Sequence, residues 1–154
     1  MQKFGFRLES VLKLKSQLED NAKNCLARAT RELESQKDYL EDLKNTNEGS
    51  INSLNAEVDE GIPVYRIRTY NSYLSFMKNK ITEQKENVNI AEQDVDINRE
   101  SLIKAMQERK ILDKLKEKKY HEYVKEQNKA EQLLIDELNS YKFKDGSGEE
   151  NAGY

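Results

Sequence analysis

The fold is decided by residues 67–102, which read IRTYNSYLSFMKNKITEQKENVNIAEQDVDINRESL. Apolar or small side chains recur there in alternating steps of three and four, at Ile67, Tyr70, Leu74, Met77, Ile81, Val88, Ala91, Val95 and Leu102. Gln84 and Asn98 interrupt the series. This spacing places the side chains on one narrow stripe of an α-helix. A stripe this narrow buries a partner helix, so the stretch predicts a coiled coil.

The composition of the whole chain also argues against a layered globular core. The chain has 154 residues, of which 36% are hydrophobic and 36% charged, with one proline and no tryptophan. Lysine and glutamate alternate, and the formal net charge is only -3. Interleaved charges are typical of solvated helix faces rather than of nucleic-acid binders. The composition therefore predicts a rod with a seam for a core.

The sequence gives no sign of export or of membrane insertion. No apolar run approaches the roughly 18 to 20 residues that span a bilayer. The N-terminus lacks the apolar stretch of a signal peptide. We therefore expect a cytoplasmic protein with no direct membrane insertion. Cys25 is the single cysteine, and its predicted seam position indicates a small buried side chain.

Two helices are expected, at about 5–58 and about 64–142. The first helix carries its own periodic series, at Leu8, Leu18, Ala22, Cys25, Ala29, Leu33, Gln36, Leu40 and Leu43. Gly61 suits a helix C-cap and Pro63 the first turn of the next helix, so 59–63 should form a corner. Residues 143–154 are expected to be a disordered tail. The predicted fold is all-α: two long helices in an antiparallel coiled coil with a longer second helix.

Folding about the corner also sets which residues face each other. Leu18 should lie beside Lys104 and Leu8 near Lys114, so everything past about Lys116 should overhang. Residues 32–60 hold nine acidic residues and two lysines, whereas residues 104–125 hold eight basic and four acidic residues. The rod is therefore expected to have an acidic corner and a basic open end, which partners could use to orient it.

The usual combinations of catalytic residues find no support in the sequence. It has one histidine, His121, and it has no glycine-rich phosphate loop, paired-cysteine motif or nucleophile elbow. We expect no enzyme activity, no cofactor and no metal site. The basic stretch 110–119 is interrupted by Asp113 and Glu117, which favours docking on a protein over binding to nucleic acid.

Aromatic residues gather just after the predicted corner. Tyr70 and Met77 belong to the seam, whereas Tyr73 and Phe76 point elsewhere on the same helix. Large apolar side chains outside the seam stay in contact with water in a two-helix rod. The alternatives left open are a docking patch and incidental exposure.

Several segments together resemble one known family. They are FGFRLESVL at 4–12, Ala27 and Ala29 with Leu33, ERKILDKLKEKKY at 108–120, EQ at 131–132 and DE at 136–137. In their order, and with the chain length and the Gly61 corner, they resemble the FliJ family of flagellar export proteins. The resemblance extends to about Leu138.

The resemblance implies a non-catalytic coiled coil similar to the central stalk, or gamma, subunit of rotary ATPases. Members of the family insert their open helical end into the hexameric export ATPase FliI and promote ring assembly. They link the ring to the cytoplasmic domain of the export gate FlhA, and they meet the regulator FliH and export chaperones. The implied location is cytoplasmic, at the periphery of the membrane-bound flagellar export apparatus, with the protein monomeric when free.

The resemblance also implies two sets of contact residues. The face for the export gate aligns with Tyr73, Met77, Lys80 and Gln84, which lie along one helix stripe. Met77 also belongs to the predicted seam, and these two assignments conflict. The contact with the ATPase ring is assigned to Phe6, Arg7, Leu8, Arg109, Leu112, Lys116 and Lys119.

The alternative function is a structural coiled coil that tethers or spaces other proteins without coupling to an ATPase. Such a tether should self-associate in parallel through the same seams, with its corner straightened. A monomer whose second helix packs on its own first helix would favour the stalk.

Overall fold

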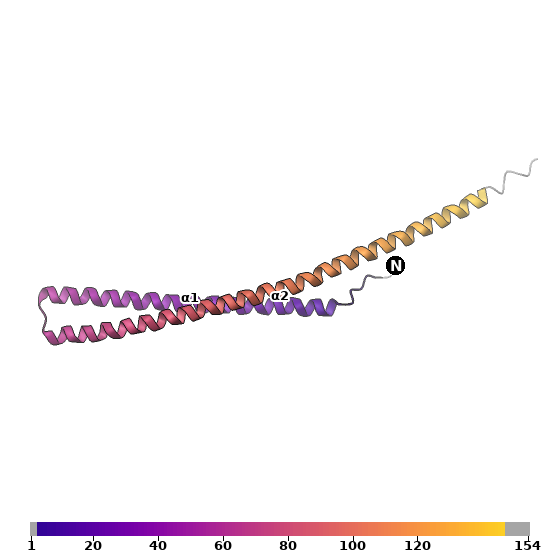
Figure 1. Cartoon of the computed structure of the whole chain (residues 1–154). Helices are drawn as coiled ribbons and strands as arrows, with labels where there is room; N and C mark the ends of the chain where they lie inside the picture. Colours follow the sequence, from indigo (N-terminus) through magenta and orange to yellow (C-terminus); the bar gives the residue numbers. More distant parts are fainter. Residues whose placement is uncertain (1–2, 147–154) are drawn as a thin grey trace, which may run out of the picture. The chain divides into compact units, whose positions relative to one another are not determined.

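A computed structural model describes residues 3–146, and all of their regular structure is helical. Helix α1 (Glu9–Glu60) has 52 residues and helix α2 (Val64–Gly146) has 83. Figure 1 shows the two helices joined by a short connection. The predicted all-α fold with a longer second helix is confirmed. No helix among residues 3–146 combines the length and apolar character needed to span a membrane.

The connection between the helices is made by residues 61–63. Gly61 adopts a φ of 85°, in the left-handed region that glycine occupies without strain. Its amide donates to the carbonyl oxygen of Val58 at 3.1 Å, which ends α1. Pro63 directly precedes α2, and its carbonyl oxygen accepts from the amide of Arg66 at 3.0 Å. Glycine and proline therefore act at this corner as the sequence predicts.

The contacts divide the chain into two units. The hairpin unit comprises Ser16–Gln107, and the terminal unit comprises the residues up to Lys15 together with those from Glu108 onward. In the hairpin unit α1 and α2 run antiparallel side by side (Figure 1). In the terminal unit the start of α1 and the residues before it pack on the second half of α2.

The core of the hairpin unit is a thin seam. Its buried apolar side chains are those of Ala29, Met77, Val88, Ala91 and Val95. Four of these five come from the stripe on α2 that the sequence predicts. Because these side chains occupy one stripe of the helix, most of its remaining surface stays in contact with water.

A polar layer interrupts this seam at Gln84, which is only 3% exposed. Its side-chain amide donates to the backbone oxygen of Gln36 at 2.9 Å and to the side-chain oxygen of Gln36 at 2.7 Å. Its own side-chain oxygen accepts from Asn87 at 3.1 Å. A paired polar layer in a coiled-coil seam favours the one register that satisfies it. The interruption in the apolar series therefore has a structural role.

The predicted seam of α1 is wrong at two positions. Leu18 is 44% exposed and Cys25 is exposed, whereas Glu19 is buried and Leu26 half-buried. The seam follows Glu19 and Leu26, one position further along the helix. Glu19 is only 4% exposed, and its carboxylate lies 3.0 Å from the ammonium of Lys23. The charged residue Glu19 is thus buried at the seam, where the apolar pattern predicts its neighbour Leu18.

The helix ends also differ from the predicted ones. Helix α1 begins at Glu9 rather than near residue 5, and it ends at Glu60. Helix α2 continues to Gly146, so residues 143–146 of the predicted tail are helical. Residues 147–154 of that tail lie outside the described residues.

Candidate protein-binding sites

The terminal unit brings together residues from the start of the chain and from the second half of α2. Phe6, Arg7 and Leu8 line one cavity of about 680 Å³ with Leu115 and Lys119. Four of the residues predicted to contact the ATPase therefore share a surface, although they lie more than a hundred positions apart in sequence. They meet because the non-helical residues 3–8 lie along α2 rather than extending α1.

An aromatic cluster holds this N-terminal segment against α2. The ring of Phe4 lies 5.3 Å from that of Tyr120, edge to face, and 5.5 Å from that of Tyr123. Aromatic pairs at such distances contribute about 0.5–1.5 kcal/mol beyond burial. Sequence reasoning did not single out Phe4 as a packing residue. The sequence feature that could have indicated this contact is Phe4, an aromatic residue just before α1 that lies opposite Tyr120 and Tyr123, one turn apart on α2.

Ion pairs fasten the start of α1 to α2 in the terminal unit. The ammonium of Lys15 lies 2.7 Å from the carboxylate of Glu108, and that of Lys116 lies 2.8 Å from the carboxylate of Glu9. These side chains are 30–44% exposed, so each pair contributes about 0.2–1 kcal/mol. The predicted register, which pairs Leu18 with Lys104, would place Lys15 opposite Gln107. The Lys15–Glu108 pair therefore differs from it by one residue.

The other residues predicted to contact the ATPase have local partners. The guanidinium of Arg109 forms an ion pair with Asp113, one turn further along α2. Leu112 is half-buried. Lys119 is exposed and donates to Glu122 at 2.7 Å. That hydrogen bond raises the pKa of Lys119 and lowers the pKa of Glu122.

The bare part of α2 begins later than the sequence predicts. The N-terminal segment covers α2 as far as Tyr123 and Glu126, so the overhang does not start at Lys116. Beyond Gln127 every side chain described is exposed. Large apolar side chains are among them: Leu133, Leu134, Ile135, Leu138, Tyr141 and Phe143. Exposed apolar side chains at this density are typical of surfaces that bind other proteins.

The stripe predicted to face the export gate needs a correction. Met77 is 4% exposed and Gln84 is 3% exposed, because both side chains belong to the seam with α1. The conflict over Met77 is thereby resolved in favour of the seam. Tyr73 is 39% exposed, and Lys80 is exposed, with its ammonium 5.7 Å from the centre of the Phe76 ring. The accessible residues near the corner are therefore Tyr73, Phe76 and Lys80.

Tyrosines and Arg66 form a hollow beside this exposed group. Tyr65, Arg66, Thr69, Tyr70 and Tyr73 line a cavity of about 510 Å³. The hydroxyl of Tyr70 donates to the carboxylate of Glu57 on α1 at 2.9 Å, and this bond raises the pKa of Tyr70. Arg66 lies 3.2 Å from the other oxygen of the same carboxylate. The aromatic face near the corner is thus held by polar contacts between the helices.

A metal site finds no support within residues 3–146. No three His, Cys, Asp or Glu side chains in that range are grouped as metal ligands would be. His121 is exposed, 3.9 Å from the carboxylate of Glu117 one turn away.

Comparison with known proteins identifies a matching family and a solved structure with a similar fold. The family model for the flagellar FliJ protein matches residues 3–148. The solved structure of a protein described as a YscO homolog, from Chlamydia trachomatis, is similar with a TM-score of 0.63. That comparison covers 96% of this chain and 100% of the other, at 23% sequence identity, and it supports the fold alone. No curated protein matches this chain significantly.

Proposed function

Because the chain belongs to the FliJ family of flagellar export proteins, we propose that it is the central stalk of the export ATPase ring. In this role it promotes assembly of the FliI hexamer and couples the ring to the FlhA gate. FliH and export chaperones are its further partners. The protein is monomeric when free and works in the cytoplasm, at the periphery of the membrane-bound export apparatus.

One observation carries the proposal. The terminal unit gathers Phe6, Arg7, Leu8 and Lys119 on one surface, beside the exposed apolar stretch of α2 beyond Gln127. Protein interfaces commonly combine buried apolar anchors with complementary charges around them, and this surface offers both. This surface belongs to the terminal unit, whereas the residues near the corner belong to the hairpin unit.

The accessible side chains near the corner support the second half of the proposal. Tyr73, Phe76 and Lys80 offer two aromatic rings and a cation on one short stretch of α2. Aromatic and basic side chains of this kind are frequent anchors in protein interfaces. We assign the gate contact to these three residues, with Met77 and Gln84 supporting them from the seam.

The experiment is a titration of the export ATPase with this protein, with ATP hydrolysis and ring formation as readouts. The Arg7→Glu/Lys119→Glu variant should stimulate hydrolysis only at about tenfold higher concentration, because two exposed cations of this surface become anions. Lys78→Glu/Lys85→Glu is the matched control, since it makes the same charge change on exposed residues of the hairpin unit.

Two further measurements distinguish a role as ATPase stalk from a role as structural tether. Circular dichroism should show that both variants keep their helix content, so that weaker stimulation reports binding. Sedimentation should show a monomer. A stable homodimer that leaves ATP hydrolysis unchanged would contradict the stalk and favour the tether.

A further inference from the structure

One flank of the hairpin unit carries apolar side chains where a two-helix coiled coil usually carries charges. Ile90 is 57% exposed and Ile97 is 62% exposed, and they lie one heptad apart on α2. On α1, Leu18 is 44% exposed and Cys25, one heptad later, is also exposed. Positions beside a two-helix seam are typically occupied by Glu and Lys. This flank is therefore more apolar than pairing of α1 with α2 requires.

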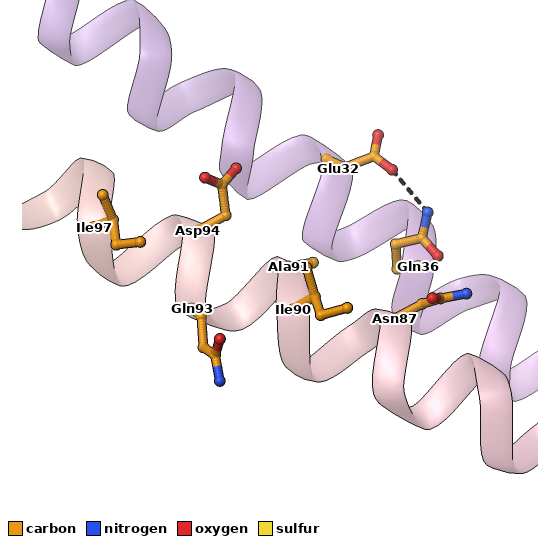
Figure 2. A pocket seen from close by; sticks show the side chains of 8 residues that line it. All are labelled: Glu32, Gln36, Asn87, Ile90, Ala91, Gln93, Asp94 and Ile97. Carbon is orange, nitrogen blue, oxygen red and sulfur yellow. Dashed lines mark hydrogen bonds between the residues drawn. The ribbon is translucent and has the colours of Figure 1, made fainter.

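Three of these side chains, Ile90, Ile97 and Cys25, border an open groove between the two helices. Ile90, Asp94 and Ile97 from α2 and Glu32 and Gln36 from α1 line a hollow of about 580 Å³ (Figure 2). A second hollow, of about 300 Å³, is lined by Cys25, Arg28, Glu32 and Asp94 among others. Because Glu32 and Asp94 line both, the two hollows adjoin on the same flank.

The opposite flank has ordinary coiled-coil chemistry. Lys37 of α1 lies 3.5 Å from Glu92 of α2, an ion pair that crosses between the helices. Arg99 pairs with Asp96 at 3.1 Å. On this side the charged residues thus find partners of opposite charge within the hairpin unit. An apolar stripe wider than one seam is typical of a helix that packs against two neighbours.

The larger hollow is acidic as well as apolar: the charged side chains that line it are those of Glu32 and Asp94, whereas Arg28 lines only the smaller one. The carboxylate of Glu32 accepts from Gln36 at 2.7 Å, and that of Asp94 accepts a longer contact from Asn98 at 3.4 Å. Neither carboxylate forms an ion pair with a lysine or arginine in the described part of the chain. The same groove of a second copy would bring like charges together, whereas a basic partner would satisfy them.

We propose that this groove binds a third helix, supplied by another protein. The occupant is an amphipathic α-helix with apolar residues at heptad spacing and with Lys or Arg beside them. Its apolar residues cover Ile90, Ile97 and Cys25, and its cations pair with Glu32 and Asp94. The groove lies wholly in the hairpin unit, so this site is separate from the proposed ATPase contact in the terminal unit.

The test uses the full chain and a synthetic peptide of about four heptads, with leucine in the apolar positions and lysine beside them. Binding of the labelled peptide is measured by fluorescence anisotropy. Ile90→Ser/Ile97→Ser should weaken binding at least tenfold, and Glu32→Gln/Asp94→Asn should weaken it and reduce its dependence on salt. The control is Ile51→Ser/Ile103→Ser, which changes two exposed isoleucines of the hairpin unit that do not line the groove and should leave binding unchanged.

Cys25 gives a second readout because it is the single cysteine of the chain. A bromoacetyl form of the lysine peptide should alkylate Cys25 faster than a bromoacetyl peptide of scrambled sequence. Equal binding of a peptide with glutamate in place of lysine, or equal binding to the Ile90→Ser/Ile97→Ser variant, would overturn the proposal. A homodimer abolished by that variant would also overturn it, since the occupant would then be a second copy.

Discussion

The side-chain amide of Gln84 on α2 donates to the side-chain oxygen of Gln36 on α1 at 2.7 Å, inside the seam of the hairpin unit. The two residues belong to helices that meet only after the chain has reversed at the corner. This hydrogen bond can form in one register of the two helices alone. The apolar residues on both sides of it are compatible with several registers.

The Gln84→Ala variant tests this polar layer. It should lower the free energy of unfolding by about 1–2 kcal/mol, because Gln36 loses a buried hydrogen-bond partner. Urea denaturation followed by circular dichroism gives the value. Gln36→Leu/Gln84→Leu should instead raise the stability while broadening NMR signals from the hairpin unit, since the register is no longer selected. Sharp signals from the double variant would contradict a register role.

Phe4→Ala tests the aromatic cluster of the terminal unit. The change should speed hydrogen exchange at the start of α1 and around Tyr120 and Tyr123, because the N-terminal segment loses its anchor. Exchange in the hairpin unit should not change. Phe143→Ala is the control, since that ring is 87% exposed. An identical exchange map for Phe4→Ala and the unchanged protein would show that Phe4 does not hold the segment.

Two glycine substitutions should have opposite signs. Gly61→Ala should lower the stability by about 1 kcal/mol, because its φ of 85° is unfavourable for any residue with a Cβ. Gly49→Ala should raise the stability by about 1 kcal/mol, because Gly49 lies inside α1 with open space around a new Cβ. Urea midpoints of the two variants provide the comparison. A higher stability of Gly61→Ala would mean that alanine causes no backbone strain at the corner.

The hydrogen bond between Tyr70 and Glu57 predicts a pH dependence near the corner. The pKa of Tyr70 is raised above its ordinary value of 10.0, chiefly because its hydroxyl donates to the Glu57 carboxylate. The stabilisation is therefore present below pH 10.0 and is lost as the pH rises through the folded-state pKa. NMR titration of ¹³C-labelled tyrosine should show the pKa of Tyr70 falling toward 10.0 in Glu57→Gln. Glu60→Gln serves as the control, and an unchanged pKa in Glu57→Gln would refute the assignment.

The sequence predicts the architecture well because both helices are long and strongly patterned. The stripe of α2 and the Gly61 corner could be identified from spacing and from backbone preferences alone. The seam of α1 could be identified only in part, since Leu18 and Cys25 are apolar residues on the flank while Glu19 is buried. An apolar pattern does not distinguish a seam from a neighbouring apolar flank when the two are offset by one residue.

The candidate sites were predictable only in part, for a related reason. Met77 and Gln84 share a helix stripe with Tyr73 and Lys80, and only packing against α1 decides which of them are covered. The N-terminal segment is not periodic, so its contact with Tyr120 and Tyr123 depends on where α1 begins. If α1 began a few residues earlier, this segment would be a further turn of helix and would not pack on α2.

The corner at residues 61–63 also has a consequence for how the chain folds. Bonds across the two helices join residues 13 apart in sequence at Tyr70 and Glu57, 48 apart at Gln84 and Gln36, and 93 apart at Lys15 and Glu108. Closing a short loop loses less entropy than closing a long one, so pairing should begin at the corner and spread toward the chain ends. The terminal unit then forms last and opens first. The surface that we propose for the ATPase contact is therefore completed only after most of the chain has been synthesised and paired.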